Sequence, residues 1–205
     1  VLARFFEIVG ETSLQDAADI GDAIVDWRDA DDEPLTNGAE DAYYEGLPEG
    51  YPCKNGRFDV LEELLLVKGI TPAVFAKVKD RLTVFGSGPI NVNTADGLVL
   101  QSLGVSRELA EKIVSFRAGG DGNEGTEDDN IFEDAGAIYD ALSQKEALSG
   151  KDGEDLEAAI AAGFLGVRSE NFLGETVGAF RDQEGAVRIV FVINRNAQIR
   201  YWREG

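Results

Sequence analysis

The sequence predicts an α+β fold in which an N-terminal helix packs on a small C-terminal antiparallel sheet, with an all-α domain inserted between them. Three observations support this prediction. Apolar residues recur at spacings of three and four over residues 13–28, a unit of two helices joined by a Gly turn occurs twice between residues 59 and 117, and the C-terminal residues alternate between apolar and polar. The predicted boundaries are 1–56 for the first helix and an acidic loop, 57–163 for the inserted domain, and 164–205 for the sheet.

The helix predicted over residues 13–28 begins at Ser13, whose hydroxyl suits an N-cap, and it presents Leu14, Ala17 and Ile24 on one face. Before it, residues 5–9 have the composition of the end of an earlier apolar helix. After it, residues 29–56 contain three prolines and four glycines. This composition predicts a long loop, with at most a short helix near residues 39–44.

The two helical units share one kind of turn. Gly69 and Thr71 in the first unit correspond to Gly104 and Ser106 in the second. In each, the glycine ends one helix and the hydroxyl side chain caps the next. This correspondence predicts a duplicated helix–hairpin–helix unit. The alternative is that two unrelated helical hairpins share a Gly turn.

Further elements follow from local patterns. The first unit is predicted over residues 59–84, where Asp59 and Glu62 have the spacing of a capping box. The second unit and later helices are predicted over 94–103, 107–117, 133–147 and 154–163. Strands are predicted over 172–180, 187–193 and 198–203, with turns at 183–186 and 195–197.

Composition excludes several kinds of function. The chain of 205 residues has no His and a single cysteine, Cys53, so it cannot use His-based catalysis, a His-ligated metal or an intrachain disulfide. Its formal net charge is −20, which argues against a nucleic-acid binder, because phosphate-driven affinity requires a basic face. No apolar run approaches the length of a membrane helix. The remaining chemistry is that of carboxylates, amides and carbonyls, the ligands of hard cations.

The glycine-rich acidic loop over residues 119–130 is the first candidate for such chemistry. Its acids and amides are spaced by glycines, so the backbone can curl around a cation, and without a cation the crowded carboxylates would repel one another. The sequence therefore predicts a calcium site here, although the glycine and glutamate of an EF-hand are missing from their positions. The candidate ligands are Asp121, Asn123, Glu127, Asp128 and Asp129.

A second acidic segment follows the first predicted helix. Asp29, Asp31, Glu33 and Glu40 have the spacing of an EF-hand loop, but Pro34 occupies the position at which that loop needs glycine. The EF-hand interpretation therefore fails. A looser calcium site remains an alternative to helix-end capping by solvated acids.

Two other functions are weighed and not favoured. The Gly turns and the nearby lysines and arginines are compatible with a DNA-binding hairpin, but Thr71 and Ser106 stand where such hairpins usually carry a second glycine, and the acidic blocks would repel phosphate. A carboxylate enzyme is possible in principle, but no acid pair stands out among 39 acids. We therefore predict that the protein is not an enzyme, with a DNA-uptake or DNA-binding protein as the alternative.

A series of motifs resembles a known family. They are DWRDAD at residues 26–31, GAED at 38–41, YY at 43–44, ELLLVKGI at 63–70 and INVNTA at 90–95. In this order they resemble the minor pseudopilin K family of type II secretion systems (the general secretion pathway), and the resemblance covers essentially the whole chain. The loop at 119–130 is similar to, but shorter than, the calcium loop of the major pseudopilin.

The resemblance implies a pilin-like body interrupted by a helix–hairpin–helix (SAM-like) domain, at the tip of a periplasmic pseudopilus. It implies the minor pseudopilins I and J as partners, no nucleic acid, bound calcium, and a structural role in pseudopilus assembly and protein export. Family members begin with a prepilin leader and an apolar helix that anchors them in the inner membrane of Gram-negative bacteria. Because this chain carries neither, we expect it to be the periplasmic portion of a longer protein.

Overall fold

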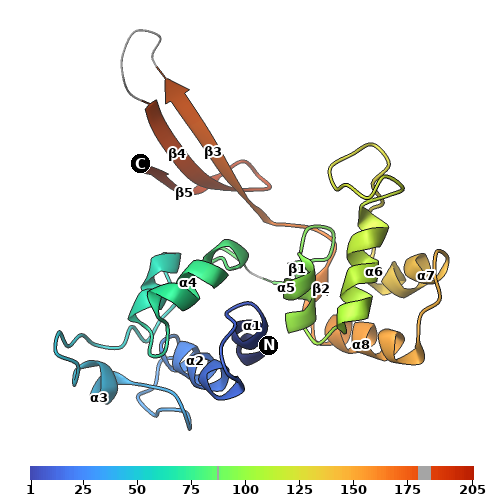
Figure 1. Cartoon of the computed structure of the whole chain (residues 1–205). Helices are drawn as coiled ribbons and strands as arrows, with labels where there is room; N and C mark the ends of the chain where they lie inside the picture. The colour runs from blue at the N-terminus through green and yellow to red at the C-terminus, as the bar shows by residue number, and fades with distance from the viewer. Residues whose placement is uncertain (87, 180–185) are drawn as a thin grey trace.

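A helical body and a separate three-stranded sheet make up the computed structural model, which describes residues 1–86, 88–179 and 186–205 (Figure 1). Across those residues, no helix has the length and hydropathy needed to cross a membrane.

The body begins with two helices that pack against each other. Helix α1 spans Leu2–Ile8 and α2 spans Leu14–Asp26. The Ser13 hydroxyl accepts the amide of Asp16, as the N-cap prediction requires. The two helices lie close together at Gly21, where a Cβ would be in van der Waals contact with Ala3, 3.4 Å from its backbone nitrogen. A long loop follows, interrupted only by the short helix α3, Asp41–Tyr44.

The two Gly-turn units have matching turns. Gly69 and Gly104 both have positive φ, +84° and +108°, and the hydroxyls of Thr71 and Ser106 cap the helices that follow. The first unit contains η1 (Leu61–Leu66), α4 (Pro72–Val78) and η2 (Lys79–Arg81). The second unit contains α5 (Gly97–Ser102) and α6 (Arg107–Arg117).

The predicted start of the first unit is wrong in detail. The segment is a 3-10 helix rather than an α-helix, and Glu63, not Glu62, closes its first turn. The Glu63 carboxylate accepts the amides of Asp59 at 2.9 Å and Val60 at 3.2 Å. Glu62 instead pairs with Arg203 of the sheet. Spacing alone did not distinguish these two adjacent glutamates.

The C-terminal part of the body contains η3, Ala135–Ala137, α7, Ile138–Ser143, and α8, Gly150–Ala161. A capping box formed by Ser149 and Asp152 begins α8. A short parallel pair that the sequence analysis did not predict joins β1, Ile90–Asn91, to β2, Leu165–Gly166. It ties the start of the second unit to the end of the helical region.

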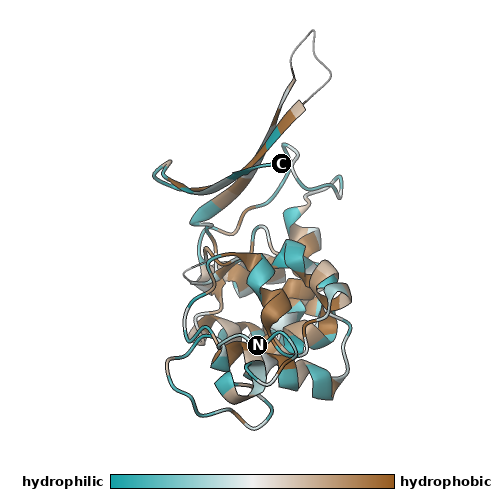
Figure 2. Ribbon diagram, turned by 90° about the vertical axis from the view of Figure 1, so that its left-hand side faces the viewer, coloured by the Kyte–Doolittle hydropathy of each residue, from teal (hydrophilic) through white to brown (hydrophobic). Residues whose placement is uncertain are grey.

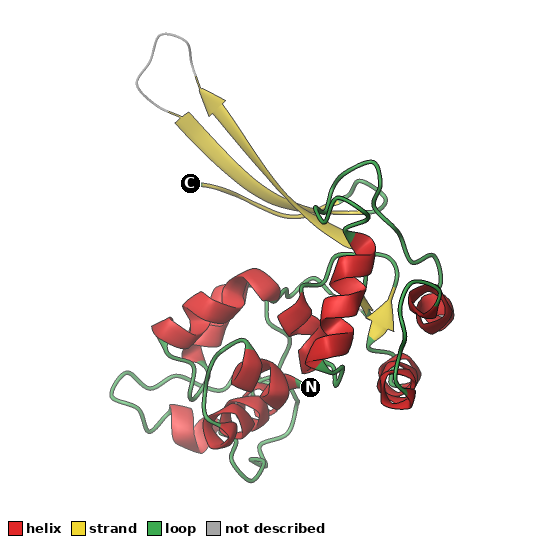
Figure 3. Ribbon diagram, turned by 45° about the vertical axis from the view of Figure 1, so that its right-hand side comes forward, coloured by secondary structure: helices red, strands yellow, loops and turns green. Residues whose placement is uncertain are grey.

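The three predicted strands form an antiparallel sheet in the order β3-β4-β5. Strand β3 spans Asn171–Ala179, β4 Ala186–Asn194 and β5 Ile199–Glu204. The alternation of apolar residues therefore located these strands correctly. The predicted strand residue Phe180 and the turn residues 183–185 lie outside the described residues. Figure 3 shows the sheet projecting from one end of the body.

The prediction that this sheet packs on the first helix is wrong. One apolar cluster joins the helices, and it contains residues from Phe5 to Leu165 but none from β3, β4 or β5 (Figure 2). Helix α1 packs against both α2 and α5, and the apolar residues of α1 and α2 are buried within the helical body. The sheet meets the body through polar and edge contacts, including the Phe85 and Tyr201 rings at 5.8 Å and an ion pair between Arg203 and Glu62 at 3.1 Å. A period-two pattern identifies an apolar face but not what covers it.

The domain boundaries at residues 56 and 163 stay a prediction, and the extent of the apolar core bears on them. The apolar cluster is continuous across residue 56, because Phe6 of α1 and Leu100 of α5 belong to the same core. The sheet residues after position 170 lie outside that core.

Candidate metal centre

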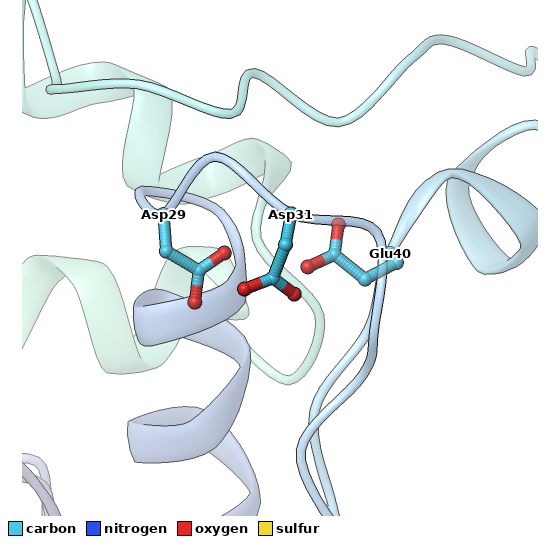
Figure 4. A group of neighbouring side chains, drawn as sticks. All are labelled: Asp29, Asp31 and Glu40. Atoms are coloured by element: carbon cyan, nitrogen blue, oxygen red, sulfur yellow. The ribbon is translucent and has the colours of Figure 1, made fainter.

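Three acids from two segments converge at the end of α2. Asp29 and Asp31 lie in the turn after this helix, and Glu40 is the residue before α3. Each contributes a carboxylate oxygen, and these oxygens all lie within 4.8 Å of one another (Figure 4). Within the described parts of the chain, this is the one group of three or more acid or thiol side chains that is arranged in this way. We call it the acid triad.

Asp26 shapes the loop that delivers Glu40. Its side chain is fully buried, and its carboxylate accepts the amides of Leu35 at 3.2 Å and Ala39 at 2.7 Å. A Cβ at Gly38 would overlap this carboxylate, so the loop needs glycine there. Burial raises the pKa of Asp26, against the opposing effect of the two amides.

Lys68 holds the same loop from the other side. Its ammonium donates to the carbonyls of Asn37 and Gly38, each at 3.0 Å, and lies over the Tyr43 ring. Because Lys68 belongs to the first Gly-turn unit, that unit and α2 together fix the position of the loop before Glu40.

The negative charge of the triad has no compensating partner at Glu40. Glu40 is 4% exposed, and neither of its carboxylate oxygens has a hydrogen-bond partner among the described residues. One oxygen of Asp29 is also buried and without a partner there. Burial raises the pKa of Glu40, the nearby Cys53 thiol opposes this in part, and the neighbouring carboxylates of Asp26, Asp29 and Asp31 raise it further. A buried, unpaired carboxylate beside other acids is costly unless a cation compensates it.

The donor set fits a hard divalent cation. Carboxylate oxygens are the ligands that calcium prefers, and a cation here would supply the missing partners of Glu40 and Asp29. The nearby thiol of Cys53 is a soft donor, which a hard cation does not favour, and burial raises its pKa to about 11.

The predicted loop site is arranged differently. Its carboxylates accept backbone amides rather than converge on one point: Asp128 accepts from Gly120 at 2.6 Å and Asp121 at 3.1 Å, and Asp129 accepts from Gly125 at 2.7 Å. The Thr126 hydroxyl and these amides lower the pKa of Asp128. The glycines that make the loop pliable also provide the amides that satisfy its acids.

The other predicted loop ligands are not brought into one group. Asp121 accepts the amide of Asn123 at 2.8 Å, and Glu127 and Asp129 line a surface depression beside Arg117. Arg117 is buried and donates to the carbonyls of Val92 at 2.6 Å and Ala95 at 2.7 Å, while its other nitrogens bind Glu124 of the loop. This arginine anchors the loop to the second Gly-turn unit.

Three basic side chains of the two units lie beside acids of this chain. Lys77 pairs with Glu11 at 2.7 Å, Arg81 pairs with Asp96, and Lys112 lies 3.5 Å from Asp152. Neighbouring acids of this chain therefore already compensate these cations.

The sequence analysis treated the acid triad as the weaker of two candidate calcium sites, whereas the structure brings its three acids together. The spacing of Asp29, Asp31 and Glu40 was visible, but Pro34 argued against a standard loop. The sequence analysis missed the role of Asp26, another acid close to this segment. Its carboxylate accepts the amides of Leu35 and Ala39, and these bonds shape the loop although the glycine of an EF-hand is absent.

Comparison with known proteins gives a consistent result. Residues 1–87 match the family model described as type II secretion system protein K. The curated type II secretion system protein K of Dickeya chrysanthemi is 34% identical over 125 residues, 57% of this chain and 34% of its own length. That of Aeromonas hydrophila is 35% identical over 87 residues, 41% of this chain and 26% of its length. The chain thus spans about a third or less of these relatives.

A solved structure shares the fold. One chain of the GspK-GspI-GspJ complex from the enterotoxigenic Escherichia coli type 2 secretion system superposes with a TM-score of 0.72 at 17% identity, over all of this chain and 68% of that one. The acid triad lies within the segment that the family model matches. The first part of the chain is thus similar in sequence to type II secretion system protein K, and the whole chain shares the fold of one component of that complex.

Proposed function

We propose that this chain forms part of a minor pseudopilin that stands at the tip of a type II secretion pseudopilus and supports its assembly and protein export. The observation that carries the proposal is the fold match, which extends over the whole chain to one component of a GspK-GspI-GspJ complex. The sequence match to type II secretion protein K over residues 1–87 supports it independently. Partners equivalent to pseudopilins I and J follow from this proposal.

The sheet supports a pilin-like arrangement in the complete protein. The side chains of Phe172, Phe191, Trp202 and Ile199 share one face of the sheet, and Trp202 is 57% exposed while Ile199 is 65% exposed. An apolar face of this kind is stable in water when another apolar element covers it. We propose that an apolar helix of the longer protein covers it, and that the same helix anchors the protein in the inner membrane, with this portion in the periplasm.

We also propose that the body binds calcium, with the acid triad as the first site. The unpartnered and buried carboxylate of Glu40 supports this assignment. The loop ligands predicted from sequence, among them Asp128 and Asp129, form a second proposed site that requires rearrangement of the amide contacts described above. In both places the ion would have a structural role, because it would hold separate segments of the chain together.

We further propose that the two Gly-turn units derive from a helix–hairpin–helix (SAM-like) ancestor that serves as a packing module here. The matching positive-φ glycines and hydroxyl caps support this proposal. The ion pairs of Lys77, Arg81 and Lys112 disfavour DNA binding as its purpose.

Co-expression with the pseudopilins I and J encoded in the same genome tests the main proposal. We expect the three chains to elute together in size-exclusion chromatography, in a complex that does not form with an unrelated pilin. Elution of this chain separately from I and J, under conditions where I and J bind each other, would contradict it. A DNA-mobility assay at moderate salt tests the alternative, and we expect no shift.

A further inference from the structure

Two asparagines between α2 and η1 are each followed by a glycine. The chain has nine asparagines, and glycine follows only Asn37 and Asn55, at Gly38 and Gly56. The residue after an asparagine matters because its backbone nitrogen can attack the asparagine side chain, and a side chain on that residue hinders the approach. Glycine has no side chain, so both dipeptides have the local sequence that favours this reaction.

The two asparagines share one electrostatic feature. The side-chain nitrogen of Asn37 donates to the carboxylate of Asp22 at 3.2 Å, and that of Asn55 donates to the carboxylate of Asp32, also at 3.2 Å. A nearby negative charge opposes loss of the proton from the attacking backbone nitrogen, and it does so at both sites. Neither the dipeptide nor this nearest charge distinguishes the two sites, so any difference between them comes from the packing of the backbone.

The backbone at Asn37 is held firmly. Gly38 donates its N–H to the carbonyl of Leu35 at 3.0 Å, and the carbonyls of Asn37 and Gly38 both accept the Lys68 ammonium. A Cβ at Gly38 would overlap the Asp26 carboxylate, so this glycine has little freedom to move. Attack on the Asn37 side chain requires the peptide plane before Gly38 to rotate. The loop must therefore open before Asn37 can react.

The backbone at Asn55 is held less firmly. The N–H of Gly56 makes a long bond of 3.4 Å to the carbonyl of Trp27, and a Cβ at Gly56 would meet nothing closer than the carbonyl oxygen of Lys54, at 3.6 Å. The side-chain oxygen of Asn55 has no hydrogen-bond partner among the described residues. Asn55 has a φ of +47°, which asparagine tolerates better than most residues, and this conformation accounts for an asparagine at the position.

We propose that Asn55 is a site of spontaneous deamidation in the folded protein and that packing protects Asn37. A base in the solvent takes the proton of the Gly56 nitrogen, and this nitrogen attacks the side-chain carbon Cγ of Asn55. The N–Cγ bond forms, the Cγ–Nδ2 bond breaks, and Nδ2 takes a proton from water and leaves as ammonia. Water then opens the cyclic imide at one of its two carbonyls and leaves aspartate or isoaspartate. The net change is hydrolysis of an amide, with no oxidation or reduction.

The product places a charge where the structure does not compensate it. The hydrogen bond from Asn55 to Asp32 is replaced by repulsion between two carboxylates. One oxygen of the new carboxylate also takes the buried position of the unpartnered amide oxygen. Deamidation should therefore loosen the contact between Asn55 and the turn that carries Asp31 of the acid triad. The proposal does not depend on the secretion role or on bound calcium.

Peptide mapping by mass spectrometry tests the proposal, on the folded chain incubated at mildly alkaline pH with a chelator. Glu40, Glu45 and Glu49 separate the two asparagines, so a glutamate-specific protease places them on different peptides. In the folded chain Asn37 should deamidate at about a tenth of the rate of Asn55 or less, because opening its loop breaks several hydrogen bonds. In urea the two rates should become similar, since the dipeptides are the same.

Variants check the site and its consequence. Gly56→Ala places a Cβ in ordinary van der Waals contact, so the fold should persist while Asn55 deamidates more slowly and Asn37 is unaffected. Asn55→Asp mimics one product and should lower the melting temperature. Adding Asp32→Asn should restore part of the loss, because an amide then faces a carboxylate again.

Four results would overturn the proposal. The first is equal rates at the two asparagines in the folded chain, and the second is a difference of the same size in urea, which would assign it to sequence. The third is an Asn55 that stays intact in the folded chain while it deamidates in urea. The fourth is an Asn55→Asp variant as stable as the unmodified chain, which would contradict the effect on the loop.

Discussion

The buried carboxylate of Asp26 accepts the amide of Ala39 at 2.7 Å, one residue before the metal-ligand candidate Glu40. This contact crosses a loop that begins at the end of α2, so a residue of the helix determines where Glu40 lies. Asp26 acts on the proposed site through the backbone, and it is not itself one of the three converging acids.

Replacing Asp26 with alanine should destabilise the protein and weaken calcium binding together. The amides of Leu35 and Ala39 would lose their acceptor, at a cost of about 1–3 kcal/mol for a buried group left unsatisfied. Urea unfolding gives the stability change and a calcium titration gives the affinity. Asp26→Asn retains an acceptor oxygen and should lose less of both. Equal losses in the two variants would show that the carboxylate acts by charge rather than by organising the loop.

Calcium should raise the melting temperature, since an ion that binds only the folded state stabilises it by about 2.7 kcal/mol at 100 times its dissociation constant. Glu40→Gln should abolish most of this response. In chelator the same variant should be more stable than the unmodified protein, because it removes a buried charge from an acidic cluster.

Asp128→Asn is the matched control for this experiment, because Asp128 belongs to the other acidic segment and its carboxylate already accepts amides. We expect it to retain the part of the calcium response that comes from the triad and to lose only what the second proposed site adds. If Asp128→Asn abolished the response and Glu40→Gln did not, the ion would belong to the loop and the triad assignment would be wrong.

We expect Asp152 to make part of the free energy of unfolding depend on pH in the acidic range. Burial raises its pKa, but hydrogen bonds from Ser149 and the charge of Lys112 outweigh this effect, and the net pKa lies below 3.8. The folded state thus binds the proton more weakly than the unfolded state. The stabilisation is present above pH 3.8 and is lost as pH falls through the lower, folded-state pKa. Asp152→Asn should flatten this part of a urea-unfolding pH series, and an unchanged acid limb would contradict the assignment.

Gly38→Ala should be strongly destabilising, because the new Cβ would overlap the Asp26 carboxylate and displace the loop. Gly97→Ala is its matched control. Gly97 begins α5, nothing lies within 4 Å of a Cβ there, and alanine reduces the entropy of the unfolded chain, so a gain of about 0.4–1 kcal/mol is expected. Similar unfolding free energies for the two variants would exclude the steric argument.

Local signals in the sequence predicted much of the fold. The caps at Ser13, Thr71 and Ser106 formed as expected, because an N-cap depends only on residues one turn away. The strands were also located, since alternation is a property of each segment. The position of the sheet was not predictable in this way. It depends on which apolar surfaces find each other, and α1 and α2 satisfied theirs within the helical body.

The candidate site likewise combines features that local sequence predicts with features that depend on distant contacts. The glycine-rich loop was favoured for its composition, yet its own amides satisfy Asp128 and Asp129. The acid triad depends on the loop folded by Asp26 and Lys68, and Lys68 lies far along the chain from Glu40. A ligand set assembled through such distant contacts cannot be found from spacing alone.

The separation of the sheet from the apolar core has a thermodynamic consequence. We expect the helical body and the sheet to unfold as two cooperative units, because they are joined by residues 167–170 and a few contacts such as Phe85 with Tyr201. Heating should therefore produce two transitions. An ion bound near Glu40 would shift the transition of the helices and leave that of the strands in place.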